Sequence, residues 1–174
     1  LDQSNGDRAF VPASVAKLPT AAFALDALGP DYRFTTEVLG TGSVNNGRLN
    51  GDLILKGGGD PELDTDALQT LGGRLLANGL RSVSGRFSVD SSALPHVPQI
   101  EATQAVDASY NPSISGLNLN FNRVHLKWDA RNGRQNLSVE AASQTLSPPV
   151  SGVRVALNNT PDAPLFEYRR SATQ

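Results

Sequence analysis

The 174-residue sequence predicts a mixed α/β (α+β) fold. An alanine-rich apolar run from Val15 to Leu28 has helical spacing and ends at a glycine-proline pair. Residues 51–90 give a strand, a helix and a strand in that order, which indicates an α/β unit. The second half alternates apolar and polar residues over 117–128, 135–141 and 151–157, a pattern typical of a β-rich sheet or sandwich.

Composition excludes several classes of protein. Hydrophobic residues make up 39% of the chain, enough for the core of one domain, or of a small domain plus part of another. A net charge of -2 gives no electrostatic footprint for nucleic acid. Without cysteine there is no disulfide framework and no thiolate metal site. No apolar run approaches the ~20 residues of a transmembrane segment. Because Leu1 is not an initiator methionine, we expect a processed start, with any signal peptide removed.

The first helix follows a predicted hairpin. Leu1 to Val11 contains a turn-rich cluster followed by Arg8–Val11, which we expect to be the second arm of that hairpin. If Ala13 is the N-cap of the helix, Pro19 is about its sixth residue, and we expect a bend in the first two turns.

Ser14 and Lys17 open this helix with a Ser-x-x-Lys spacing. Residues i and i+3 share a helix face, so the lysine amine can reach the serine oxygen, as in a serine nucleophile with its own base. To act as a base the lysine must be neutral, which requires burial or a neighbouring cation. The alternative is a helix-opening serine beside a solvated lysine, since sixteen serines and three lysines give about 0.3 such spacings by chance.

The next segment predicts two strands around a hairpin. Residues 31–39 and 51–56 are strand-like, and Asn46-Gly47 between them is a strong hairpin turn pattern. The glycine run 57–59 indicates unusual dihedral angles or close backbone approach. A phosphate-binding loop is disfavoured because Asp60-Pro61 follows the glycines, where that loop needs Lys-Ser/Thr.

A second helix and a strand complete the α/β unit. Asp64-Thr65-Asp66 predicts the start of the helix and Asn78-Gly79 its end, with Leu68, Leu71 and Leu75 on one face. Residues 83–90 alternate as one half-buried strand, and residues 91–112 are irregular.

The last predicted strands follow this irregular segment. The alternation over 117–128 changes phase, which predicts a β-bulge near Asn122-Arg123. A turn at Asn132-Gly133 leads into the strand at 135–141, and the tail from 158 to 174 shows no strong period.

Other candidate side chains favour structural roles. His96 lies between prolines and His125 in a strand, and neither accompanies a Gly-x-Ser-x-Gly elbow, so a Ser-His-Asp hydrolase is disfavoured. A metal site has too few imidazole or thiolate ligands. Phe121 and Trp128 are expected in the core or on a sheet face rather than in a carbohydrate platform.

The sequence contains four ordered blocks, Pro12–Leu18, Leu28–Thr36, Gly47–Leu53 and Gly57–Pro61, followed by the later stretches Val83–Asp90 and Leu117–Asn122. The four blocks resemble the N-terminal half of the class C low-molecular-mass penicillin-binding proteins, the D-alanyl-D-alanine carboxypeptidase/endopeptidases of the S13 serine peptidase type, and the two later stretches are similar as well. The resemblance covers nearly the whole chain. Four ordered blocks at family-like spacing are far more specific than one Ser-x-x-Lys.

The resemblance implies a domain organisation and an activity. Residues 1–35 would be the N-terminal part of a β-lactamase/transpeptidase-like, penicillin-binding domain, and residues 36–174 an inserted, incomplete second domain, β-rich with one α/β unit. Ser14 would form an acyl-enzyme and Lys17 would accept its proton. The expected substrates are peptidoglycan peptides ending in D-Ala-D-Ala. β-Lactams would also bind, without metal or cofactor, in a periplasmic or extracytoplasmic location.

Two later family elements, a Ser-x-Asn triplet and a Lys-Thr-Gly strand, have no convincing counterpart here. The formal matches Ser43-Val44-Asn45 and Ser109-Tyr110-Asn111 precede the expected position, and Lys56-Gly57-Gly58 is a poor imitation of Lys-Thr-Gly. We therefore expect the 174 residues alone to be nearly inactive. The alternative function is a non-catalytic peptidoglycan-docking or interaction module derived from the same family.

Overall fold

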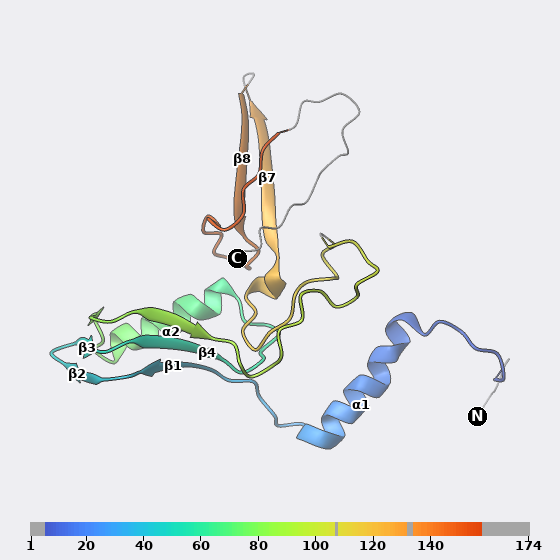
Figure 1. The fold of residues 1–174 in the computed structure, drawn as a ribbon, viewed down its shortest axis with the longest axis horizontal. Helices are drawn as coiled ribbons and strands as arrows, with labels where there is room; N and C mark the ends of the chain where they lie inside the picture. Colours follow the sequence, from blue (N-terminus) through green and yellow to red (C-terminus); the bar gives the residue numbers. More distant parts are fainter. Residues whose placement is uncertain (1–5, 107, 132–133, 158–174) are drawn as a thin grey trace. The chain divides into compact units, whose positions relative to one another are not determined.

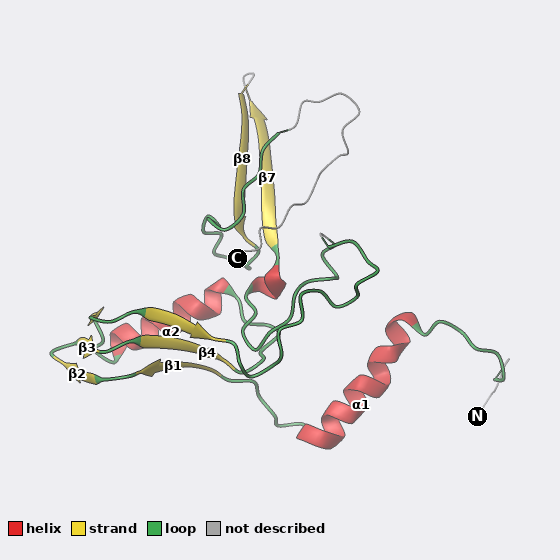
Figure 2. Cartoon of the chain, viewed as in Figure 1, coloured by secondary structure: helices red, strands yellow, loops and turns green. Residues whose placement is uncertain are grey.

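The computed structural model describes residues 6–106, 108–131 and 134–157. The chain divides into two compact units, Leu1–Arg33 and Phe34–Gln174. Figures 1 and 2 show a helical first unit and a second unit that contains all of the described strands. The mixed α/β class predicted from the sequence is confirmed. The assignment of residues 1–35 and 36–174 to two functional domains stays a prediction.

The first unit contains a short 3-10 helix, η1 (Ala13–Ala16), followed by the helix α1 (Lys17–Leu28). The predicted stop is confirmed: Gly29 caps α1 with φ 81° and donates its N–H to the Leu25 carbonyl at 3.0 Å. The predicted strand over Arg8–Val11 is wrong. Among the described residues this segment pairs with no strand, and Val11 is 91% exposed, so nothing stabilises an extended ladder there. The first arm of that hairpin, residues 1–5, lies outside the described residues.

The predicted bend at Pro19 is also misplaced. Since α1 begins at Lys17, Pro19 is its third residue rather than about its sixth. The first four N–H groups of a helix have no partner within it, so the missing proline N–H breaks no helical hydrogen bond. The irregularity lies earlier, in the 3-10 turn that carries Ser14.

The second unit contains two three-stranded sheets, whose strands follow one another as three long strands, each with a break of two or three residues. The strands and helix are β1 (Thr36–Gly40), β2 (Ser43–Asn45), β3 (Arg48–Asn50), β4 (Leu53–Gly57), α2 (Thr65–Ala77), β5 (Ser82–Val83) and β6 (Phe87–Asp90). β1 pairs antiparallel with β4, and β2 with β3. After α2, β5 and β6 run parallel to β3 and β4, which confirms the α/β unit. The predicted strand over 31–39 begins only at Thr36.

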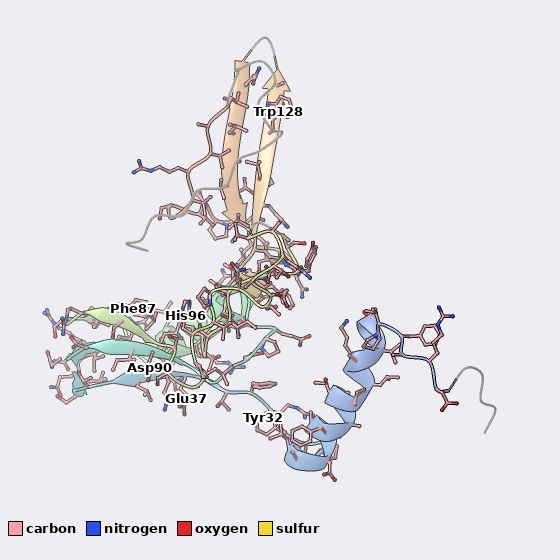
Figure 3. All side chains as sticks on the ribbon, turned by 45° about the vertical axis from the view of Figure 1, so that its right-hand side comes forward. Tyr32, Glu37, Phe87, Asp90, His96 and Trp128 are labelled. Atoms are coloured by element: carbon pink, nitrogen blue, oxygen red, sulfur yellow. The ribbon has the colours of Figure 1, made fainter. Side chains whose placement is uncertain are left out.

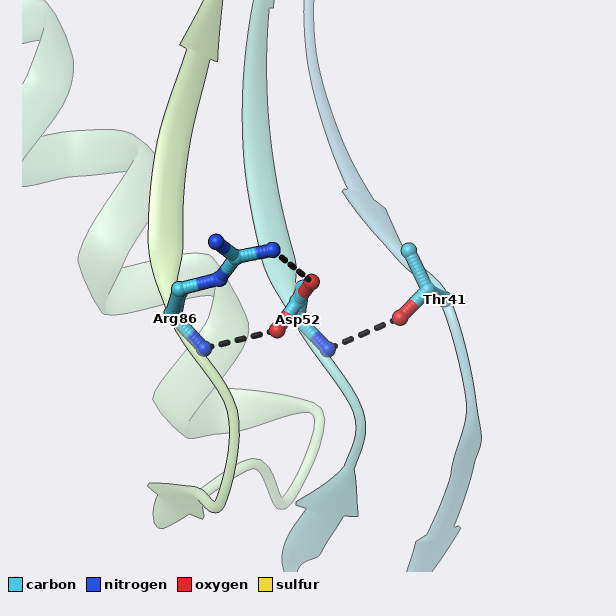
Figure 4. A network of polar contacts seen from close by, with 3 residues as sticks. All are labelled: Thr41, Asp52 and Arg86. Atoms are coloured by element: carbon cyan, nitrogen blue, oxygen red, sulfur yellow. Dashed lines mark hydrogen bonds and ion pairs between the residues drawn. The ribbon is translucent and has the colours of Figure 1, made fainter.

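Polar contacts hold the break in these strands together (Figure 4). The Asp52 carboxylate accepts the Arg86 backbone N–H at 2.7 Å and lies 3.7 Å from its guanidinium. The Asp52 backbone N–H donates to Thr41 Oγ1 at 2.8 Å. The predicted single strand over 83–90 is therefore interrupted at residues 84–86, because side-chain and cross-strand bonds replace regular pairing there.

Two local predictions for the second unit are confirmed. Asn46 and Gly47 connect β2 to β3 with φ values of 51° and 78°, as a type I′ turn requires. Asp64 caps α2 by accepting the Ala67 N–H at 2.7 Å. Close approach at the glycine run is confirmed as well, since a Cβ on Gly58 would lie 2.3 Å from the Thr35 carbonyl oxygen.

The predicted bulge near Asn122-Arg123 is wrong. The chain forms a 3-10 turn, η2 (Asn120–Asn122), and the strand β7 (Val124–Arg131) begins only after it. All three residues of η2 have positive φ, between 53° and 56°, so the change of phase marks a reversal of the backbone rather than an inserted strand residue. β7 pairs antiparallel with β8 (Arg134–Ala141), while the predicted turn at 132–133 lies outside the described residues.

The predicted strand over 151–157 is not formed. Only the preceding residues reach β8, where Val150 donates its N–H to the Val139 carbonyl at 2.9 Å. Among the described residues the buried hydrophobic side chains are Leu49, Leu55, Leu63, Val139 and Ala141. Trp128 projects from β7 with 64% of its surface exposed (Figure 3), so it is a sheet-face residue. Phe121, 52% exposed in η2, is neither in the core nor on a sheet.

Candidate active site

Ser14 and Lys17 lie together in the first unit. Lys17 Nζ donates a hydrogen bond to Ser14 Oγ at 2.8 Å, and both side chains are exposed within this unit. The 3-10 conformation of η1 explains the contact, because a 3-10 helix has three residues per turn and places residues i and i+3 directly above one another. The pair predicted from an α-helical face is therefore aligned by a tighter turn.

The residue before Ser14 is strained. Ala13 has φ 45°, in the left-handed region that a residue with a Cβ seldom adopts, at a cost of roughly 1–2 kcal/mol. The Pro12 carbonyl accepts the Val15 N–H at 2.9 Å and closes the turn around it. Ser14 thus lies on a fixed turn just before the N-terminus of α1, where free N–H groups and the positive end of the helix dipole favour negative charge.

This arrangement can activate a hydroxyl nucleophile. A neutral lysine amine at hydrogen-bond distance can accept the serine proton as the serine oxygen attacks. Within the described part of the first unit, no second cation contacts Lys17, whereas the Arg33 guanidinium bonds the carbonyls of Pro30 and Tyr32.

The two formal Ser-x-Asn matches have structural roles. Asn45 donates to Ser43 Oγ at 3.3 Å inside β2. Asn111 is only 2% exposed, and its amide bonds the backbone N–H and carbonyl of Glu101, which closes the loop before η2. Neither triplet presents a free serine and amide pair to a ligand.

Lys56, the first residue of the poor Lys-Thr-Gly match, lies in a charged row across the sheet. The register places it between Glu37 of β1 and Asp90 of β6, both labelled in Figure 3. Hydrogen bonds from Ser92, and secondarily the charge of Lys56, lower the pKa of the Asp90 carboxyl. The position of Lys56 is therefore explained by a structural role, in which its charge lies between carboxylates on the two neighbouring strands.

The histidines form no site in the part of the chain that the structure describes. His96 and His125 are both exposed, and no group of three potential metal ligands occurs among the described residues. None of the described helices is long and apolar enough to cross a membrane.

Sequence reasoning missed the contacts made by Asp66. Its carboxylate accepts the Thr145 hydroxyl at 2.5 Å, the Thr145 N–H at 2.9 Å and the Leu146 N–H at 3.1 Å, and Ser143 adds a further bond. These bonds, those of Thr145 foremost, lower the pKa of Asp66. The capping sequence predicted a helix start here, but the partners lie almost eighty residues further along the chain and carry no local pattern.

A family model and several known proteins match this chain. The model of the D-Ala-D-Ala carboxypeptidase 3 (S13) family matches residues 1–167. The D-alanyl-D-alanine carboxypeptidase DacB of Haemophilus influenzae is 35% identical over 88 residues, which are 51% of this chain and 18% of that protein. The D-alanyl-D-alanine carboxypeptidase of Actinomadura sp. (strain R39) is 38% identical over 92 residues, 53% of this chain and 17% of that protein. The chain thus spans less than a fifth of the length of these curated relatives.

Solved structures agree with the sequence matches. The crystal structure of penicillin binding protein 4 (dacB) from Haemophilus influenzae superposes with a TM-score of 0.62 and 27% identity, covering 74% of this chain and 29% of that one. The same protein in complex with a novel beta-lactam gives a TM-score of 0.54 at 27% identity, covering 74% of this chain and 26% of that one.

Proposed function

Since its family model covers residues 1–167, this chain belongs to the D-Ala-D-Ala carboxypeptidase 3 (S13) family, and we propose that it carries the nucleophile of a serine-type D-Ala-D-Ala carboxypeptidase. The substrates are peptidoglycan peptides ending in D-Ala-D-Ala, and β-lactams acylate the same serine. The reaction takes place in the periplasm or another extracytoplasmic compartment. Residues 1–35 belong to the penicillin-binding domain and residues 36–174 to a domain inserted in it, which the division into compact units at Arg33 and Phe34 supports.

The 2.8 Å hydrogen bond between Lys17 Nζ and Ser14 Oγ carries this proposal. Ser14 Oγ attacks the carbonyl carbon between the two D-alanines, and neutral Lys17 takes the serine proton. The proton passes to the leaving amine as the peptide bond breaks, which releases D-alanine and leaves an ester on Ser14. Water then attacks the ester carbonyl and gives its proton to Lys17, which passes it to Ser14 Oγ as the ester bond breaks, so the serine is regenerated and the shortened peptide leaves with a free carboxyl group.

Lys17 must be neutral when it acts, which requires a neighbouring cation or burial that its exposed setting in the first unit does not supply. Catalytic groups that act as a unit lose most of their effect when one is removed. We therefore expect the 174 residues alone to acylate very slowly, and the full product of the gene to acylate rapidly.

Intact mass spectrometry with a labelled penicillin tests the proposal. In the full gene product, Ser14→Ala should abolish the mass shift and Lys17→Ala should slow acylation by about 10²–10⁴-fold. Ser43→Ala is the matched control, since Ser43 belongs to a formal Ser-x-Asn triplet but its hydroxyl bonds only Asn45 of its own strand, and it should acylate like the wild type. Acylation that survives Ser14→Ala would refute the assignment. A full product that never acylates would favour the non-catalytic docking module instead.

A further inference from the structure

The second unit contains a hollow whose lining residues are distant in sequence from the turn that carries Ser14. It has a volume of about 280 Å³, and residues 59–61, 94–100 and 112–123 contribute to its wall. Apolar contacts come from Leu94, Ile100 and Ile114, while Asn118 and Arg123 are polar. Gly59, with φ 83°, lets Leu94 approach closely, since a Cβ there would lie 3.1 Å from the Leu94 methyl.

Phe121 borders this hollow from a strained turn. A bulky residue with positive φ is a genuine outlier, and here φ is 56°, between two asparagines that also have positive φ. Asn122 holds one side of the turn by donating to the Ser113 carbonyl at 2.8 Å and to Asn118 Oδ1 at 2.9 Å. The surrounding hydrogen bonds thus hold the Phe121 ring at the edge of the hollow with 52% of the residue exposed, although burial would normally stabilise an aromatic ring.

Arg123 is a cation held in a fixed position at the same place. Its Nε donates to the Ser109 carbonyl at 2.8 Å, and its guanidinium lies 5.5 Å from the centre of the Phe121 ring. No carboxylate of a described residue lies within salt-bridge distance of it, in contrast to Arg86 beside Asp52. The terminal nitrogens of Arg123 therefore keep donors free, among the described contacts, for an anionic ligand, with little orientational entropy left to lose.

We propose that the Arg123–Phe121 hollow binds the C-terminal carboxylate of a short peptide whose last residues have small apolar side chains. The terminal nitrogens of the guanidinium donate two hydrogen bonds to the planar carboxylate, and the small side chains lie against Leu94, Ile100 and Ile114. A volume of about 280 Å³ is slightly below the usual range for ligand pockets, about 300–1,000 Å³, which suits two small residues rather than a large or extended ligand. We expect this site to bind the peptide without catalysing a reaction, because its lining residues include no nucleophile paired with a base.

The site would let the protein hold one peptide end here while Ser14 acts on another. This role, and the choice of a D-Ala-D-Ala probe, rest on the proposed function, but the site itself depends only on Arg123, Phe121 and the hollow. Penicillin acylation at Ser14 reports on the proposed function alone, so a failure of one proposal can be told from a failure of the other.

The test is a titration of the ¹⁵N-labelled chain carrying Ser14→Ala with N-acetyl-D-Ala-D-Ala, followed by ¹H–¹⁵N correlation spectra. We expect saturable shifts at Gly59, Ile114 and Asn118 and at the Arg123 Nε group. Arg123→Gln should weaken binding by about tenfold or more, because the charge-assisted contact is lost. Arg86→Gln, at an exposed arginine of the same unit, is the control and should leave the dissociation constant unchanged.

The same peptide with a C-terminal amide needs no protein variant and should also bind about tenfold more weakly. This second arm keeps the test valid if Arg123→Gln perturbs the fold. Shifts centred on residues 13–17, equal binding of acid and amide, or no saturation by roughly 10 mM would each overturn the proposal.

Discussion

Asn120 connects the strained turn to the start of helix α2, and its removal should be costly. It is only 4% exposed and has φ 53°. Its Oδ1 accepts the Thr65 N–H at 3.0 Å and its Nδ2 donates to Thr65 Oγ1 at 2.9 Å, across 55 residues of sequence. Two such bonds contribute about 1 kcal/mol each, and a residue with a Cβ but no local polar group costs about 1 kcal/mol more at this φ. Asn120→Ala should therefore lower the free energy of unfolding by about 3 kcal/mol.

Two further variants separate these contributions. Asn120→Gly loses the same bonds but relieves the backbone strain, so it should cost about 2 kcal/mol. Asn46→Ala changes an exposed turn residue with φ 51° whose side chain makes no hydrogen bond among the described residues, so it should cost only about 1 kcal/mol.

Urea unfolding followed by the fluorescence of Trp128, the single tryptophan, measures all three variants in the second unit. If Asn120→Ala is no less stable than Asn46→Ala, the contribution of the two hydrogen bonds between Asn120 and Thr65 is refuted. If Asn120→Gly is less stable than Asn120→Ala, the backbone strain assigned to the positive φ of residue 120 is refuted.

Two other variants test the glycine run and the Asp66 contacts. Gly58→Ala should destabilise the second unit by about 2 kcal/mol or more in the same urea assay, because its Cβ would meet the Thr35 carbonyl. The control Gly72→Ala has open space in α2 and should stabilise the unit by about 0.5–1 kcal/mol. Equal effects of the two variants would contradict the close approach at Gly58. Folding lowers the pKa of Asp66 below its usual 3.8, so its contribution to stability is present above that value and is lost as the pH falls through the folded pKa. The urea midpoint of the wild type should thus fall more steeply than that of Asp66→Asn as the pH drops below about 4, and parallel pH profiles would count against the Asp66 contacts.

The sequence predicted what local rules determine. The Asn46-Gly47 turn, the Asp64 cap and the Gly29 stop each depend on one or two residues whose backbone preference or side-chain reach is intrinsic. The contact between Ser14 and Lys17 belongs to the same group, because a three-residue separation brings two side chains together in either an α- or a 3-10 helix. The pair was therefore predictable, although the helix type and the place of Pro19 were not.

The predictions that failed depend on partners distant in the chain. Residues 8–11 and 151–157 have strand-like composition, but a strand also needs a neighbour to accept its hydrogen bonds, and alternation does not report whether one exists. The change of phase near Asn122 is real, but its cause is a left-handed turn and not a bulge. A bulge and a left-handed turn both shift the phase by displacing side chains, and the bonds from Asn120 to Thr65, distant in the chain, help to select the turn.

The Phe121 turn shows how such a miss bears on function. Three consecutive residues with positive φ would be costly in isolation, yet Asn120 and Asn122 are the residue type other than glycine that tolerates this region best, so the local sequence permits the turn without requiring it. The long-range bonds of Asn120 to Thr65 and the shorter-range bond of Asn122 to Ser113 then fix it, and the ring of Phe121 and the guanidinium of Arg123 lie together as a consequence. Ser14 and Lys17 need only three residues of sequence to meet, whereas a site built on Arg123 exists only if the contact between Asn120 and Thr65 forms. Peptide binding at Arg123 should therefore weaken in Asn120→Ala, while the hydrogen bond in the Ser14 turn depends on neither asparagine.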